Sequence, residues 1–141
     1  METNEEVNNI ENLKEEISRK EEELEAAVNL YTQVYPGEHP EDNILERKKM
    51  SDRLLDPEVS SAKKDAITDL LGKEGEFVEY LSELPEEIFE EYQDDLQRNF
   101  INALSSKEYQ DEKISSQYFK NWRYKLKLVL FAEYKRESDN C

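Results

Sequence analysis

Residues 4–35 contain no proline or glycine, and their apolar side chains recur at alternating three- and four-residue steps. These steps are the a/d pattern of a heptad, which predicts one helix with a single apolar seam. Such a helix would be about 48 Å long, longer than the ~37 Å diameter of a compact globule of this chain length. It must therefore overhang the fold, bend or lie across a partner. The predicted helix-pairing seam is Ile10, Leu13, Ile17, Leu24, Ala27, Tyr31 and Val34, interrupted by Lys20.

Two interpretations of this seam stay open. The helix can pair with another chain through residues 7–35, as a homo- or hetero-oligomer, or it can pack within its own bundle. In a parallel homodimer Glu16 would face Glu21 of the other copy, and Lys20 would lie in the seam. Like charges at these positions weaken a parallel coiled coil. If the helix pairs with another chain, the sequence therefore favours an antiparallel or heteromeric pairing.

The rest of the chain also predicts helices, because prolines and glycines fall between stretches of helical periodicity. The Asp56–Pro57 step is typical of a helix start, and Gly72 is typical of a helix end. No stretch has the alternating β-branched pattern of a strand. We expect an all-α fold, a small acidic helical bundle. The expected helices after the first are 41–55, 57–71, 74–84, 85–105 and 114–136. We expect a long N-terminal helix (1–35) and a helical bundle (36–141) that together form one continuous domain.

The last predicted helix combines an apolar stripe with most of the basic charge of its region. Phe119, Trp122 and Leu126 lie three or four residues apart, and Val129 and Leu130 continue the stripe. We interpret the stripe as core and Trp122 as its anchor.

Charge is distributed unevenly along the chain. The protein has a formal net charge of −16, yet residues 113–141 alone carry a net charge of +4. Basic and aromatic residues together can indicate nucleic-acid binding, but an anionic protein repels phosphates. We therefore expect the basic helix to pack against acidic helices of its own chain, and we expect no direct contact with nucleic acid.

The densest acidic stretch runs from Glu74 to Asp95, where ten carboxylates occur without one basic residue. On one straight helix they would be spaced by about 3.3 Å, close to the ~3.4 Å between phosphates of a DNA strand. This pattern predicts either an interaction face for a basic partner or a solvated face that aids solubility. The candidate acidic interaction face is Glu79, Glu83, Glu86, Glu87, Glu90, Glu91, Asp94 and Asp95.

Motifs for catalysis, metal binding and membrane insertion are absent from the sequence. The single histidine, His39, has no ligand spacing around it, and the single cysteine is Cys141. The longest apolar run, Leu128 to Ala132, is far shorter than a membrane span, and the N-terminal residues lack the pattern of a signal peptide. We expect a protein that is not an enzyme, needs no cofactor or metal, contacts no membrane and is intracellular, in the cytoplasm or in a host cell, with the nucleus not excluded.

These patterns predict a non-enzymatic acidic interaction module, a subunit, adaptor or inhibitor that engages a basic surface of another protein. The alternative is an inhibitor of the phage or mobile-element type that mimics nucleic acid and blocks a DNA- or RNA-binding protein or a nuclease.

Overall fold

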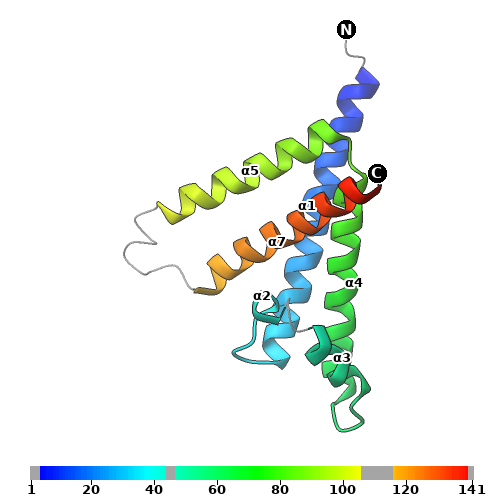
Figure 1. Ribbon diagram of the computed structural model, residues 1–141, viewed down its shortest axis with the longest axis vertical. Coiled ribbons are helices and arrows are strands. Elements are labelled where there is room, and N and C mark those ends of the chain that lie inside the picture. Colours follow the sequence, from blue (N-terminus) through cyan, green and yellow to red (C-terminus); the bar gives the residue numbers. More distant parts are fainter. Residues whose placement is uncertain (1–3, 44–46, 106–115, 140–141) are drawn as a thin grey trace.

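The computed structural model describes residues 4–43, 47–105 and 116–139, and over these residues the fold is an all-α bundle without a strand (Figure 1). The expected fold class is therefore confirmed. The elements in chain order are α1 (Asn4–Val34), α2 (Pro40–Asn43), α3 (Arg47–Leu55), α4 (Ser61–Glu83), α5 (Glu86–Leu104) and α7 (Ser116–Asp139).

The helices α1 and α4 form a column along the long axis of the molecule, and α5 and α7 extend from it to one side (Figure 1). The middle of the predicted seam faces α4, because Ile17, Leu24 and Tyr31 are buried in the common core. Leu13 and Ile10, nearer the N-terminus, are half-buried and pack against the edge of the core, and Val34 is also half-buried. The seam thus packs inside its own chain, and pairing through its middle would require displacement of α4.

Helix α4 corrects two predicted boundaries. It runs without interruption through Gly72, which was predicted to end a helix, and it begins after Ser60 rather than at Asp56–Pro57. The Ser60 hydroxyl accepts a hydrogen bond from the Lys63 amide at 3.3 Å, the usual N-cap bond. A glycine inside a helix costs about 1 kcal/mol, and the buried face of α4 outweighs that cost. This face is Ala66, Ile67, Leu70, Glu74, Phe77 and Leu81.

The predicted helix 41–55 is present as two helices, α2 and α3, with residues 44–46 outside the described part. Before α2 the chain turns at Gly37, whose φ of 84° lies in the left-handed region that favours glycine. His39 is buried in this connection, and its Nδ1 accepts a hydrogen bond from the Glu41 amide. Its Nε2 lies 2.5 Å from Asn121 Oδ1, so the histidine joins the turn to α7.

Helix α7 packs on α4 with a face that is partly rotated from the predicted stripe, of which Phe119 and Val129 are buried. Tyr124 and Leu128 are buried at its centre, and the Tyr124 hydroxyl donates a hydrogen bond to the buried carboxylate of Glu74. Trp122 and Leu126 are half-buried, whereas Leu130 is 56% exposed. The interpretation of Trp122 as the anchor is corrected accordingly. Of the predicted anchor residues, Phe119 is the one that is fully buried.

Three basic residues of α7 meet acidic residues of the same chain, as expected for this helix. Lys125 Nζ lies 3.3 Å from Glu21 and 2.5 Å from Glu25, both on α1. Arg123 and Lys127 share the carboxylate of Glu41 on α2, at 2.7 and 3.7 Å. Acidic residues of α1 and α2 thus compensate part of the positive charge of α7.

Candidate interaction surface at the α4–α5 corner

The chain turns sharply between α4 and α5, and α7 holds this corner in place. Helix α4 ends at Glu83 with Leu84 as its C-cap, and α5 starts directly after Pro85, whose fixed φ suits a helix start. Arg136 donates hydrogen bonds to the carbonyl oxygens of Ser82 and Leu84, at 3.0 and 2.6 Å. Its guanidinium also lies over the ring of Phe89, 4.7 Å from the ring centre. One cation of α7 thereby satisfies the free carbonyls at the end of α4.

The corner divides the predicted acidic face between two helices. Glu79 and Glu83 lie on the last turns of α4, and the other six carboxylates lie on α5, which leaves the column in another direction (Figure 1). The spacing calculated along a single helix therefore applies only within each of the two helices. The carboxylates instead surround a bend. We call this set the acidic corner: Glu79, Glu83, Glu86, Glu87, Glu90, Glu91, Asp94 and Asp95.

Every member of the acidic corner is exposed to solvent. Within the described part of the chain, ion pairs reach two of them, at 3.0 Å from Lys14 to Glu91 and at 3.1 Å from Arg98 to Asp95. The other six carboxylates have no ion pair there. Glu86 and Glu87 lie in the first turn of α5, where the helix dipole favours negative charge. The dipole offsets part of the repulsion, so the cluster is compatible with a stable fold.

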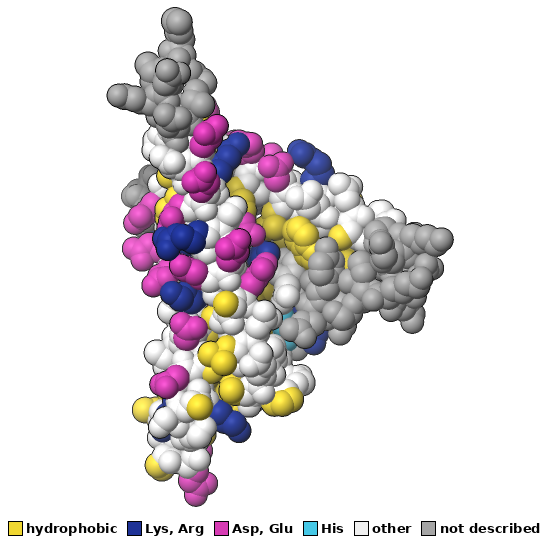
Figure 2. Space-filling view, turned by 180° about the vertical axis from the view of Figure 1, so that it is seen from behind, with side chains coloured by type: hydrophobic (Ala, Val, Ile, Leu, Met, Phe, Trp, Pro, Cys, Tyr) yellow, Lys and Arg dark blue, Asp and Glu magenta, His cyan; other side chains and the backbone are white. Residues whose placement is uncertain are grey.

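The column differs from the corner, because several of its acidic residues have basic neighbours. Seen from behind, dark-blue basic side chains lie among the acidic ones along it (Figure 2). Arg19 bonds to Glu16 and, at 3.0 Å, to Glu23, and Lys73 lies 3.7 Å from Glu23. Among the described residues, exposed carboxylates without an ion pair also occur along the column, at Glu11, Glu15, Glu22, Asp65 and Asp69, but six of them surround the corner.

Two hollows lie beside the corner, where α5 crosses α1. The larger, with a volume of about 510 Å³, we call the apolar groove. The smaller, of about 170 Å³, we call the Tyr92 hollow. Ile88 lines both, so they are neighbours. The apolar groove is lined by Asn9, Ile10, Leu13, Pro85, Glu86, Glu87 and Ile88. The Tyr92 hollow is lined by Lys14, Ile17, Ser18, Glu21, Ile88, Glu91, Tyr92 and Asp95.

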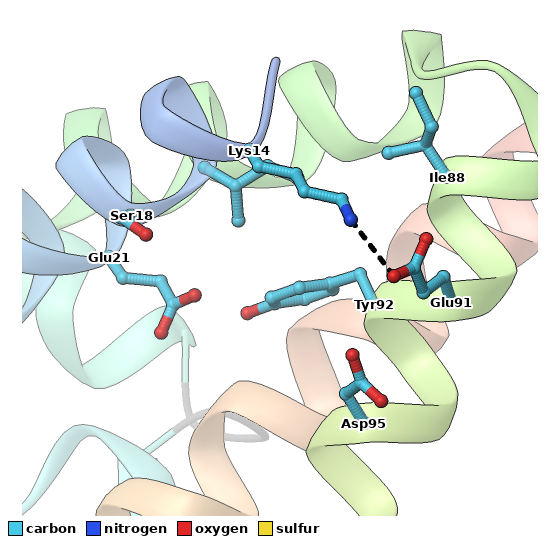
Figure 3. A pocket seen from close by; sticks show the side chains of 8 residues that line it. Lys14, Ser18, Glu21, Ile88, Glu91, Tyr92 and Asp95 are labelled. Carbon is cyan, nitrogen blue, oxygen red and sulfur yellow. Dashed lines mark hydrogen bonds and ion pairs between the residues drawn. The ribbon is translucent and has the colours of Figure 1, made fainter. Parts of the chain in front are cut away.

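Within the Tyr92 hollow, the tyrosine ring reaches from α5 towards α1, and its hydroxyl points to the side of Glu21 (Figure 3). The hydroxyl oxygen is buried and makes no hydrogen bond. Burial, and then the negative charge of Glu21, raise the pKa of Tyr92 far above its ordinary range. The hydroxyl therefore stays protonated. At the mouth of the hollow Lys14 binds Glu91, so that a cation of the chain itself already occupies part of this acidic site.

The sequence alone predicted the charged residues of this surface but missed both hollows. Ile88 and Tyr92 have the helical spacing of ordinary core residues, and Lys14 carried no signal. Pro85 was the available clue, since it marks the bend that brings α5 across α1. The half-buried seam residues Ile10 and Leu13 were predicted for helix pairing, and the structure brings them next to Glu86 and Glu87 in the apolar groove.

The described residues lack a metal-binding cluster and a membrane-spanning helix. No group of three or more His, Cys, Asp or Glu side chains among them is arranged to hold a metal ion. No helix in the same ranges is long and apolar enough to cross a membrane. Cys141 lies outside them. No protein family, curated protein or solved structure matches this chain.

Proposed function

We propose that the protein is a non-enzymatic interaction module, a subunit, adaptor or inhibitor, that binds a basic surface of another protein with its acidic corner. The observation that supports this proposal is the contrast in charge pairing. Several acidic residues on the column and beside α7 have basic neighbours, whereas the corner gathers six exposed carboxylates around one bend without an ion pair among the described residues. A cationic partner surface would supply those missing charges.

Electrostatic complementarity of this kind mainly accelerates association and selects the partner. Because the corner is exposed, its attraction is screened over about 10 Å at 0.1 M salt. Binding should consequently weaken steeply as the salt concentration rises. The rigid attachment of the corner through Arg136 keeps the carboxylates in one arrangement, which reduces the entropy lost on binding.

Mimicry of nucleic acid is the alternative that the density of charge suggested. The linear density of carboxylates supports it, and the bend at Leu84–Pro85 distributes these carboxylates over two helices of different direction. Charge alone remains in its favour. We therefore propose a basic protein surface as the partner, and competition with DNA for the same partner would distinguish mimicry from it.

The test is affinity capture from cells that express the protein, with two variants of equal charge. The first variant neutralises the corner at Glu86, Glu87, Glu90 and Asp94, by Glu→Gln and Asp→Asn substitutions. The control neutralises four exposed acidic residues near the other end of α4, namely Asp52, Glu58, Asp65 and Asp69. We expect wild type and control to retain the same partner, which about 0.5 M salt releases, and the corner variant to lose it. Equal retention by both variants would contradict the proposal.

A further inference from the structure

We propose that the outer face of α7, the side turned away from α4, is a dimer interface on which α7 of a second copy of the chain packs in the opposite direction. This inference goes beyond the proposed function, because it concerns a different surface and a different partner. The outer face is defined by Arg123, Lys127, Leu130, Phe131, Tyr134 and Glu137.

The centre of the outer face is apolar and open to solvent. Helix α7 crosses the column (Figure 1), and Tyr124 and Leu128 occupy the side that meets α4. On the other side Leu130, Phe131 and Tyr134 are exposed by 56%, 43% and 73%. Six large hydrophobic side chains are exposed in the described ranges, and the other three are scattered over α1, α3 and α5. Exposed apolar residues that cluster in this way mark interaction surfaces, whereas scattered ones do not.

The outer face also has the residue spacing of a helix-pairing seam. Its members follow one another at steps of four, three, four and three residues, which is the a/d pattern of a heptad. The seam of α1 is buried in its middle against its own chain, whereas the centre of this second seam is exposed. Two such faces can therefore interdigitate. The seam residues are Arg123, Lys127, Leu130, Tyr134 and Glu137.

The charges on the outer face select the direction of the pair. Under two-fold symmetry, an antiparallel pair that places Leu130 opposite Tyr134 of the second copy is centred on Ala132. The same arrangement places Lys127 opposite Glu137, so that opposite charges meet on both sides of the apolar centre. A parallel pair would instead bring Lys127 to Lys127 and Glu137 to Glu137, and like charges weaken pairing. The face is thus complementary to a second copy of itself.

Lys127 can make this contact without leaving a carboxylate of its own chain uncompensated. It lies 3.7 Å from Glu41, and Arg123 binds the same carboxylate more closely, at 2.7 Å. Glu137 has contacts within its own chain, and a carboxylate accepts hydrogen bonds from several donors at once. Exposed ion pairs exchange partners at little cost, so the dimer needs only a small rearrangement of these side chains.

The dimer is expected to be weak. Its apolar centre is small for a specific interface, and two chains of net charge −16 repel each other. We expect a Kd on the order of 100 µM. At about 1 µM the chain is then a monomer, and unfolding measurements at that concentration report on the chain alone. Salt screens the repulsion, so about 0.5 M salt should retain the dimer although it releases a partner from the acidic corner.

Sedimentation equilibrium of the full chain, from about 10 to 500 µM, measures this association. Leu130→Ser and Tyr134→Ser should each raise the dimer Kd about tenfold, because each removes apolar area from both halves of a symmetric interface. Leu55→Ser is the matched control and should leave the Kd unchanged, since Leu55 is 82% exposed but lies on α3.

Charge reversal tests the direction of the pair. Lys127→Glu and Glu137→Lys should each weaken the dimer about tenfold, because each places like charges opposite one another on both sides of the apolar centre. The double variant should restore the dimer, since each introduced charge then faces the opposite introduced charge. Lys127→Glu loses its contact with Glu41 in the single and the double variant alike, so the recovery reports on the contact between copies.

The outcomes separate this inference from the proposed function. A chain that stays monomeric at about 500 µM would overturn the interface, and so would equal Kd values for Leu130→Ser, Tyr134→Ser and Leu55→Ser. Failure of the double charge variant to recover the dimer would contradict antiparallel pairing. The variant with four neutralised corner carboxylates should dimerise at least as well as wild type. Loss of the dimer in that variant, or in about 0.5 M salt, would assign the association to charge at the acidic corner and overturn the interface on α7.

Discussion

Replacement of Arg136 by alanine tests how the corner is built. The guanidinium makes two good hydrogen bonds, to the carbonyls of Ser82 and Leu84, and a long one of 3.4 Å to that of Leu81. It also covers the ring of Phe89. Truncation leaves the last carbonyls of α4 without these donors and removes the clamp between α7 and the start of α5.

The expected loss follows from these contacts. Hydrogen bonds from a charged donor contribute about 1.5–3 kcal/mol in total at such a site, and a cation above a ring adds roughly 0.5–1 kcal/mol. Water replaces part of the lost bonds because the corner is close to the surface. We expect a decrease of about 2–3 kcal/mol in the free energy of unfolding, and a melting temperature lower by roughly 6–12 °C.

Urea unfolding followed by circular dichroism at 222 nm measures this loss. Arg136→Lys should recover less than half of it, because an ammonium group lacks the planar fork that reaches several carbonyls. The neighbouring exposed Lys135→Ala is the control and should change stability by less than about 0.5 kcal/mol. If Arg136→Ala unfolds at the same urea concentration as Lys135→Ala, the corner is not held in the way described.

Three further changes test other parts of the fold. Leu128→Ala should cost about 2–5 kcal/mol in urea unfolding, whereas Leu130→Ala should cost under about 0.5 kcal/mol, since the first is buried and the second is exposed; equal costs would refute the rotated face of α7. Hydrogen bonds from Arg53 lower the pKa of Glu38 from 4.5 to about 2. This pair stabilises the fold above about pH 4.5, and the contribution, about 1 kcal/mol at this partly exposed site, should be lost as the pH falls towards 2; an identical pH dependence of unfolding in Arg53→Ala would exclude it. Gly37→Ala should cost about 1 kcal/mol because of its positive φ, and an unchanged urea midpoint would contradict that.

The sequence predicted the helices well and their ends less well, for a physical reason. Periodicity reports which residues can share a face, and it correctly gave an all-α fold. It does not report how much area that face buries. At Gly72 the local preference for a helix end was outweighed by the continuous buried face between Leu70 and Phe77. Periodicity also could not identify the buried face of α7, because apolar side chains occur both on the stripe through Trp122 and on the one through Tyr124.

For the candidate surface, too, some features could be predicted from the sequence and others could not. Charge can be read directly from the sequence, and the exposed carboxylates of the corner were all predicted as a group. The hollows depend on the angle between α1 and α5, which a single side chain of α7, Arg136, helps to fix from more than fifty residues away in the chain. No local sequence pattern predicts the contact of Arg136 or the burial of the Tyr92 hydroxyl.

Carbodiimide cross-linking of the captured partner tests the central proposal most directly, because it joins carboxylates to lysine amines that are in contact. Mass spectrometry of the cross-linked peptides then identifies the carboxylates that face the partner. The account predicts cross-links at Glu86, Glu87, Glu90 and Asp94, and their loss in 0.5 M salt. Cross-links confined to Asp52, Glu58, Asp65 and Asp69, with none at the corner, would contradict it.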